Sequence, residues 1–302
     1  MALISRRMFL TGSAGLLAAG ASGAGYAGYV EPALQLVVTE YRPVLPAWPD
    51  DFPLAIAIVT DVHAGGYSMT LKRIQAIVER TNALKPDLIL HLGDHEAQYA
   101  IDLPQVPRAG WGEALGALKA PLGVYGVLGN HDWWRNLKDI RSTLGRAQVP
   151  VLENEGVLLE KGGRKFWLLG LGDQQAHRLG RGRFRGADDL PKTLAAAKTD
   201  DPALLMVHEP DIFVKVPKRV ALTVAGHTHG GQIWFPGMPG RFIPSAYGAR
   251  FRYGHIVEGG RHLIVSGGLG TTGFPVRFGV PPEIVMIRLG ANGSPAASGT
   301  AA

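Results

Sequence analysis

Short, continuous apolar runs are the feature that most constrains the fold of this chain. Three such runs in the first half are "PLAIAIVT" at 53–60, "PDLILHLG" at 86–93 and "LGVYGVLG" at 122–129. Their length and even apolarity are typical of strands buried on both faces. Stretches with helical spacing alternate with them, at 69–85, 111–119 and 134–145. This β-α-β-α-β order predicts a largely parallel sheet covered by helices.

The second half of the chain is richer in strands than in helices. We expect a hairpin over 254–268 that turns at Gly259 and Gly260. Further strands are expected over 165–172, 202–208, 219–226, 232–235 and 283–289. No internal repeat and no linker divides residues 46–289. We therefore predict one α/β domain of mixed α+β character over residues 32–290.

Five of the apolar runs end in residues that can bind a metal. These residues are Asp61, His63, Asp94, Asn130, His208, His227 and His229. The carboxyl ends of strands in an open α/β sheet converge on one crevice, so we expect these side chains to meet there. Because the chain has no cysteine, a metal would be bound by nitrogen and oxygen ligands.

The size of this set favours two metal ions over one, since a single ion needs fewer ligands once water is included. A carboxylate can bridge two cations through its two oxygens, and Asp94 stands in the middle of the set in chain order. His227 and His229, two residues apart, would face the same side of an extended segment. Three glycines flank this pair: Gly226, Gly230 and Gly231. They predict a sharp turn and open space for a substrate.

Five motifs appear in a fixed order along the chain. They are D-x-H at 61–63, G-D at 93–94, G-N-H-D at 129–132, a single His208, and G-H-x-H at 226–229. In this order they resemble the calcineurin-like metallophosphoesterase superfamily, which implies a sandwich of two mixed sheets flanked by helices. "GHTHGGQI" and "GLGTTGFPVRFGVPPEI" resemble its exported or membrane-associated phosphodiesterase branch. That branch includes twin-arginine-exported phosphodiesterases and UDP-diacylglucosamine hydrolases.

The resemblance also implies roles for single residues. One divalent metal ion would be held by Asp61, His63, Asp94 and His229, and the other by Asp94, Asn130, His208 and His227. A hydroxide bridging the metals would hydrolyse a phosphodiester, phosphomonoester or pyrophosphate bond. His131 would contact the phosphate or protonate the leaving oxygen, with Asp132 orienting its ring. The ligand set accepts manganese, iron or zinc.

The chain departs from the family pattern at two places. Ala97 stands three residues after Asp94, where many relatives carry an acidic residue or a tyrosine. Relatives often have Ser-Arg-Gly where this chain has Ser266, Gly267 and Gly268. A basic side chain that could steer substrate is therefore missing there.

The two ends of the chain have the composition of targeting and tail segments. Arg6 and Arg7, followed by Phe9, Leu10 and a mild apolar stretch, resemble the twin-arginine export motif. We expect residues 1–31 to be a twin-arginine signal peptide or a retained anchor, and 291–302 to be a disordered tail. This predicts the twin-arginine translocation machinery as a partner and a periplasmic or other extracytoplasmic location. Membrane anchoring stays open.

A net charge of +6 suits an anionic partner, here a phosphoester substrate, lipid-linked or soluble, and peripheral contact with a membrane. The basic segment 177–189 could meet such an anion, and Trp133 and Trp134 could line a pocket or pack in the core. No motif that stacks bases between aromatic and basic side chains is present, so no nucleic acid is expected.

Two alternatives stay open: a UDP-diacylglucosamine-type pyrophosphate hydrolase of lipid A biosynthesis, and a non-catalytic exported metal-binding module. His91, His95, His177, His255 and His262 have no motif context.

Overall fold

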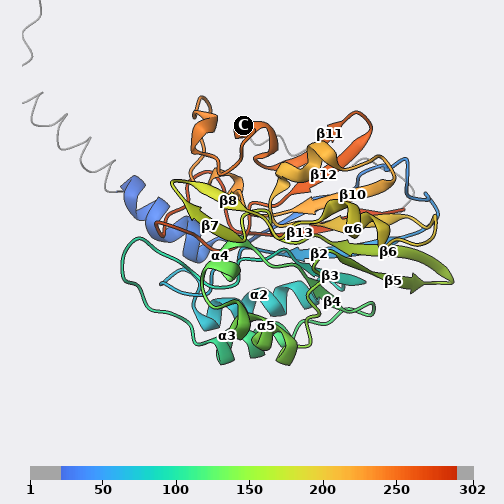
Figure 1. Ribbon diagram of the computed structural model, residues 1–302. Coiled ribbons are helices and arrows are strands. Elements are labelled where there is room, and N and C mark those ends of the chain that lie inside the picture. The colour runs from blue at the N-terminus through green and yellow to red at the C-terminus, as the bar shows by residue number, and fades with distance from the viewer. Residues whose placement is uncertain (1–21, 291–302) are drawn as a thin grey trace, which may run out of the picture.

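Two mixed sheets pack face to face in the computed structural model, which describes residues 22–290 (Figure 1). The first sheet has the order β1 (Val37–Tyr41), β13 (Glu283–Leu289), β2 (Leu54–Val59), β3 (Leu88–His91), β4 (Val124–Gly126). The second has the order β11 (Gly254–Glu258), β12 (Arg261–Val265), β10 (Val220–Ala225), β9 (Ala203–Met206), β6 (Arg164–Gly170), β5 (Glu155–Lys161). The expected tail at 291–302 and the Arg6-Arg7 motif lie outside the described residues.

The central strands of each sheet are buried on both faces, as the apolar runs predict. Along β2, Ile56 and Ile58 point into the core between the sheets, while Ala57 and Val59 face the helices. The helices on that outer face are α2 (Leu71–Ala83), α3 (Arg108–Gly116) and α5 (Leu137–Arg146). The second sheet is covered on its outer face by α6 (Leu190–Ala195) and the 3₁₀ helix η2 (Pro210–Lys215). The predicted fold class is therefore confirmed.

Most of the expected elements are present, including the hairpin β11–β12, whose register pairs Glu258 with Arg261 across the turn. The strand expected at 232–235 is wrong, because Ile233 makes only an isolated bridge to Phe278. The helix expected over 134–145 is present as α5 but begins later, at Leu137, because Asn136 caps it and the separate helix α4 (Asn130–Trp134) precedes it.

Several short elements had no clear signal in the sequence. They are β1, β5, the hairpin β7 (His177–Gly180) and β8 (Arg183–Arg185), α6, and the 3₁₀ helices η3 (His229–Gly231), η4 (Gly240–Phe242) and η5 (Gly248–Phe251). The hairpin β7–β8 forms a sheet of its own within the segment read as a basic loop. Its residues are mostly polar and exposed, so no apolar alternation marked it as a strand pair.

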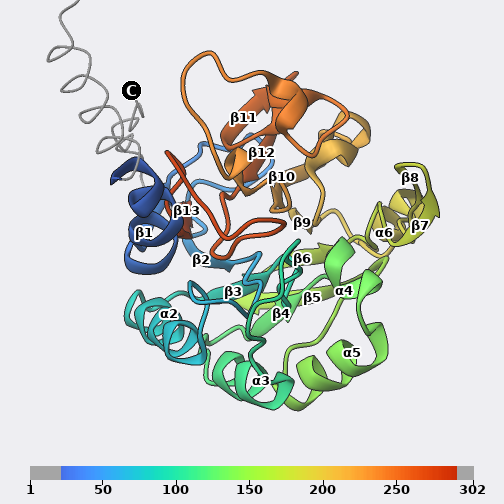
Figure 2. The ribbon, with the colours of Figure 1, turned by 90° about the vertical axis from the view of Figure 1, so that its left-hand side faces the viewer.

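The π-helix η1 (Tyr26–Leu34) runs across the boundary expected at residue 31. The buried Glu31 carboxylate accepts hydrogen bonds from the amides of Gly279 (3.0 Å) and Val280 (2.7 Å), so the helix is tied to the loop before β13. Figure 2 shows η1 lying beside β1 and β13. Within residues 22–290, no helix has the length and apolarity needed to cross a membrane.

Candidate metal centre

The predicted ligands all lie in the segments that directly follow β2, β3, β4, β9 and β10, with Asn130 at the start of α4 and His229 at the start of η3. Strands β2, β3 and β4 are mutually parallel, as are β9 and β10, so their carboxyl ends point to the same edge of each sheet. Each of the side chains is buried, with exposed fractions of 0–7%. The fold brings all of them together: Asp61, His63, Asp94, Asn130, His208, His227 and His229.

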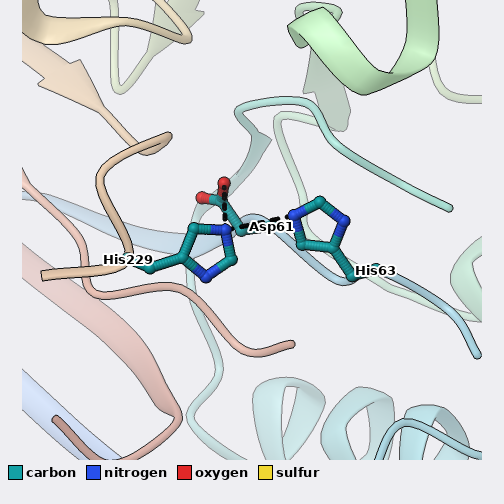
Figure 3. Close-up of side chains that lie close together, drawn as sticks. All are labelled: Asp61, His63 and His229. Carbon is teal, nitrogen blue, oxygen red and sulfur yellow. Dashed lines mark hydrogen bonds and ion pairs between the residues drawn. The ribbon is translucent and has the colours of Figure 1, made fainter. Parts of the chain in front are cut away.

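The first cluster consists of Asp61, His63 and His229, whose ligand atoms lie within 4.8 Å of one another (Figure 3). The Nε2 atoms of His63 and His229 are 3.1 Å apart, and His229 Nε2 lies 3.5 Å from an Asp61 oxygen. Nδ1 of His63 faces the Glu96 carbonyl at 3.2 Å, which directs the Nε2 lone pair inward.

The second cluster is built around Asn130. Its Oδ1 atom is 3.0 Å from His208 Nε2 and 3.0 Å from His227 Nδ1, and these two nitrogens are 3.2 Å apart. His208 donates its Nδ1–H to the Leu92 carbonyl at 2.5 Å, which again leaves Nε2 free to bind a metal.

Asp94 lies between the two clusters. Its Oδ2 atom is 3.4 Å from His63 Nε2 and 3.3 Å from His208 Nε2. Ligands about 2.1 Å from one ion are separated by about 3.0–3.4 Å in octahedral or tetrahedral geometry. The spacings of 3.0–3.5 Å in the two clusters lie in or close to this range, so the residues fit a dinuclear divalent metal site with one shared carboxylate.

The backbone of the centre is held in a left-handed conformation that non-glycine residues rarely adopt. Positive φ angles occur at Asp61 (51°), His63 (44°), Asp94 (58°), His227 (69°) and His229 (51°). Each costs of the order of 1–3 kcal/mol and persists only where the surroundings impose it. The expectation that His227 and His229 face the site from an extended segment is wrong, since both reach it from this left-handed backbone.

The space beside the glycines near the ligands is filled by neighbouring side chains of the protein and is not open to substrate. A Cβ atom on Gly226 would lie 2.4 Å from an Asp61 oxygen, so only glycine lets the carboxylate approach. A Cβ atom on Gly230 would lie 2.7 Å from the Val280 side chain, and Gly231 is packed in the same way. The open space expected at these two glycines is therefore absent.

Sequence comparison agrees with this geometry. A family model described as calcineurin-like phosphoesterase matches residues 54–231, a range that contains every predicted ligand. The chain belongs to the calcineurin-like phosphoesterase family. Membership makes the protein a metal-dependent phosphoester hydrolase, as predicted.

Two relatives align with this phosphoesterase over almost their whole length. "Uncharacterized metallophosphoesterase YkuE" of Bacillus subtilis (strain 168) is 33% identical over 300 residues, covering 96% of this chain and 99% of the relative. "Phosphodiesterase YaeI" of Escherichia coli (strain K12) is 29% identical over 292 residues, covering 95% and 100%. Among solved structures, the NAD nucleotidase NadN of Haemophilus influenzae has a TM-score of 0.48 and 16% identity, over 74% of this chain and 46% of that one.

Asp132 of the phosphoesterase supports the loop that carries the shared ligand. Its carboxylate accepts hydrogen bonds from the amides of Asp94 (3.0 Å), His95 (2.9 Å) and Gly129 (3.0 Å), and it pairs with His95 Nδ1 at 2.9 Å. The predicted role of Asp132 in orienting the His131 ring is therefore wrong, because its oxygens are directed elsewhere.

His95, which had no motif context, is the buried partner of this carboxylate. Burial alone would lower the pKa of His95, but the adjacent Asp132 carboxylate raises it above its ordinary value. The imidazole also stacks on Trp111, with ring centroids 5.6 Å apart. The only sequence signal for this role was its position directly after Asp94.

His131 is oriented by two polar side chains. Its Nδ1–H donates to Gln98 Oε1 at 3.0 Å, and its Nε2 accepts from the Thr272 hydroxyl at 3.2 Å. The amide of His131 donates to Asp94 Oδ1 at 2.8 Å, which keeps the ring beside the metal centre. Burial lowers the pKa of His131 to about 4, so the isolated ring is neutral at pH 7.

Arg277 places a guanidinium next to the first cluster, although the sequence lacks an arginine at 267. It is fully buried and donates to the carbonyls of Gly267 (2.9 Å), Gly270 (2.9 Å) and Val280 (2.9 Å). Its Nη2 atom lies 3.2 Å from His229 Nδ1. Burial lowers the pKa of Arg277 to about 10, so it stays charged. Since it is enclosed, it positions the 267–280 loop and cannot reach an incoming substrate.

Asp173 and Glu209 form a buried acidic pair beside the second cluster, and neither was predicted. Both are 1% exposed, and burial raises the pKa of each carboxyl. Glu209 follows His208 directly and forms a candidate metal-binding group with His208 and His227, because the ligand atoms of the three residues lie within 4.8 Å of one another. Glu209 also accepts a hydrogen bond from the Gln174 amide at 3.0 Å, which ties the loop after β6 to the centre.

The hairpin β7–β8 contacts Trp134, whose ring lies next to His131. The Trp134 ring lies 5.1 Å from the His131 ring and stacks on Phe184 at 5.5 Å. The Arg178 guanidinium lies 3.6 Å over the Trp134 ring, and Trp134 Nε1 donates to the Gln175 carbonyl at 2.9 Å. The half-buried Trp134 therefore joins an exposed basic hairpin to the candidate active site.

Proposed function

We propose that this chain is an exported phosphodiesterase that uses two divalent cations. The observation that carries the proposal is the position of Asp94, with one oxygen 3.4 Å from His63 and 3.3 Å from His208. One cation would be held by Asp61, His63, Asp94 and His229, and the other by Asp94, Asn130, His208 and His227. When bound, such cations supply Lewis acidity and lower the pKa of a water molecule.

The residues around the centre would bind and orient the substrate. His131 stands beside Asp94, with Gln98 and Thr272 fixing both of its ring nitrogens. It would contact the phosphoryl group and, in the stronger form of the proposal, transfer a proton to the leaving oxygen. In that form the negative charge of the bound substrate raises the pKa of His131 from its low value.

A diester is favoured as substrate class by two considerations. The relative from Escherichia coli that aligns end to end is described as a phosphodiesterase. Next to His131, the Trp134 ring and the Arg178 guanidinium offer an apolar face and a positive charge for the second alcohol group of an anionic diester.

The substrate class is tested with purified protein after chelation and addition of manganese, iron or zinc. We expect two bound cations and a higher kcat/KM on bis(p-nitrophenyl) phosphate than on p-nitrophenyl phosphate or a UDP-sugar. Preference for the UDP-sugar would favour the pyrophosphate hydrolase instead. Two bound cations without turnover of any substrate would identify a metal-binding module.

Export is tested separately from chemistry. Arg6 and Arg7 precede Phe9 and Leu10, and the twin-arginine machinery requires the pair. Replacing both arginines by lysine should trap the protein in the cytoplasm, as measured by cell fractionation. Normal export of this variant would show that the pair is not a signal.

A further inference from the structure

A cluster of exposed apolar side chains adjoins the metal centre. We call it the aromatic patch, and its members are Tyr26 (37% exposed), Tyr29 (52%), Tyr67 (41%), Ile101 (52%), Phe274 (60%) and Phe278 (40%). Monomeric soluble proteins rarely leave such a cluster open unless it contacts a partner or a membrane.

The patch is continuous although its residues come from four parts of the chain. Tyr26 meets Phe278 edge to face at 6.2 Å, and the Tyr29 and Tyr67 rings are 6.4 Å apart. The Tyr67 hydroxyl donates to the carbonyl of Pro275 at 2.8 Å. The amide of Ala100, next to Ile101, donates to the carbonyl of Gly273, next to Phe274, at 2.7 Å.

Thr272 connects this patch to the candidate active site. Its hydroxyl is 3.2 Å from His131 Nε2, and Phe274 follows two residues later with its amide bonded to the Thr272 carbonyl. On the other side of His131 lie Trp134 and the hairpin β7–β8. Figure 1 shows η1, α4 and this hairpin on the same side of the molecule.

The composition of this side favours a lipid bilayer as the occupant. The segments 26–30, 65–68, 97–101 and 272–276 contain no charged residue, and tyrosine and phenylalanine are the residues that settle at membrane interfaces. The hairpin adds four exposed arginines: Arg178, Arg181, Arg183 and Arg185. Arginines beside an apolar surface are attracted to anionic lipid headgroups.

The path of the chain supports the same occupant. Helix η1 carries Tyr26 and Tyr29 into the patch, and the sequence that precedes it contains the apolar residues Met8, Phe9, Leu10, Leu16 and Leu17 after two arginines. An apolar segment that enters the domain at the patch would place that segment and the aromatic patch against the same bilayer surface.

We propose that the aromatic patch docks on an anionic bilayer, with the metal centre opening beside the lipid surface. Residues of the patch enter the interface, and the arginines of β7–β8 contact headgroups. The consequence for substrate, an anionic phosphodiester at the bilayer surface, rests on the proposed phosphodiesterase function; the docking itself does not.

The absence of cysteine from the chain allows a direct test. Single-cysteine variants of the full chain, Ile101→Cys and Phe274→Cys, are labelled with an environment-sensitive fluorophore, with Val257→Cys on β11 (54% exposed) as the matched control. Vesicles of phosphatidylcholine and phosphatidylglycerol are then added. We expect a blue shift of the label at 101 and 274, and none at 257.

Three results would overturn the proposal. One is co-sedimentation of the protein with vesicles while both labels stay unshifted, which would mean binding through the N-terminal segment alone. Another is a shift that rises with protein concentration without vesicles, which would identify a second copy as the occupant. The third is no binding at all. Hydrolysis of soluble bis(p-nitrophenyl) phosphate, measured on the same preparations, reports separately on the proposed function.

Discussion

The metal centre and the hairpin β7–β8 are neighbours that are built in opposite ways. Every candidate ligand of the centre is buried and follows a strand of one of the two main sheets, and several are held at positive φ. The hairpin is a separate two-stranded sheet, exposed along nearly its whole length, and it meets the centre through Trp134. Its shape is therefore less constrained by the core than that of the centre.

Chemistry and selectivity are therefore set by different regions of this fold. Groups at the ends of core strands are placed within fractions of an ångström by packing, which hydrolysis requires. An appended hairpin can change its side chains without disturbing the core, which suits recognition of the non-reacting part of a substrate. Substitutions in the two regions should then differ in kind as well as in size.

Asp94→Ala should have the largest effect, because it removes the carboxylate that lies against both clusters. We expect loss of both cations and of measurable diester hydrolysis. Asn130→Ala, which touches only the second cluster, should lose one cation. Elemental analysis of the purified variants decides between these outcomes, and two retained ions in Asp94→Ala would disprove the shared-ligand assignment.

His131→Ala should keep its fold and its cations while losing roughly 10²–10⁴ in rate, the usual worth of a positioned acid. An alkoxide leaves badly without a proton, so an alkyl diester should show the full loss, about 3–5 kcal/mol of barrier. A nitrophenolate leaves readily as an anion, so an aryl diester should lose much less. Equal losses on the two substrates would point to charge stabilisation by His131 and exclude the acid role.

Asp132→Asn tests the hydrogen bonds that hold the loop carrying Asp94, because Asp132 is not itself a candidate metal ligand. The amide group cannot replace a carboxylate that accepts from three backbone amides and pairs with His95, so we expect about 3–5 kcal/mol of destabilisation. Cation affinity should fall about 10–100-fold, with turnover rescued by excess metal.

Asp139→Asn is the matched control for this substitution. Asp139 is half-exposed and pairs with Arg108 on the surface, so the change should alter the free energy of unfolding by about 1 kcal/mol or less. Chemical denaturation and metal titration are measured on both variants. If excess metal fails to restore turnover of folded Asp132→Asn, Asp132 acts on the reaction itself.

The same contrast explains how much could be predicted from the sequence. The strand-end ligands were found because apolar runs stop abruptly at His, Asp and Asn, and the parallel order of β2, β3 and β4 sends those ends to one edge. The backbone that aims His227 and His229 could not be predicted, since left-handed φ angles at non-glycine residues come from the surrounding packing.

Three roles that depend on tertiary contacts were missed or misassigned. Asp132 was paired with its sequence neighbour His131, but its partner across the loop is His95. Arg277 stands in the motif at 268–284, but its role was not predicted, because its approach to His229 depends on the closure of the 267–280 loop. The hairpin β7–β8 was read as a loop, because exposed strands rich in arginine lack apolar alternation.

Arg178→Ala should give the smallest effect and the clearest contrast with the centre. Its guanidinium lies over Trp134 on an exposed hairpin, where a cation–π contact contributes about 0.5–1 kcal/mol. We expect KM for a soluble anionic diester to rise about 2–5-fold, the equivalent of that energy, with kcat and the bound cations unchanged.

Arg183→Ala, on β8 of the same hairpin, removes the same charge from an exposed position and serves as the control. A rise in KM for Arg178→Ala alone would locate recognition at the Trp134 ring, whereas equal rises would indicate attraction by the net charge of the hairpin, which added salt would abolish. A fall in kcat would instead mean that Arg178 acts through Trp134 on His131, and the separation of chemistry from recognition between the two regions would have to be given up.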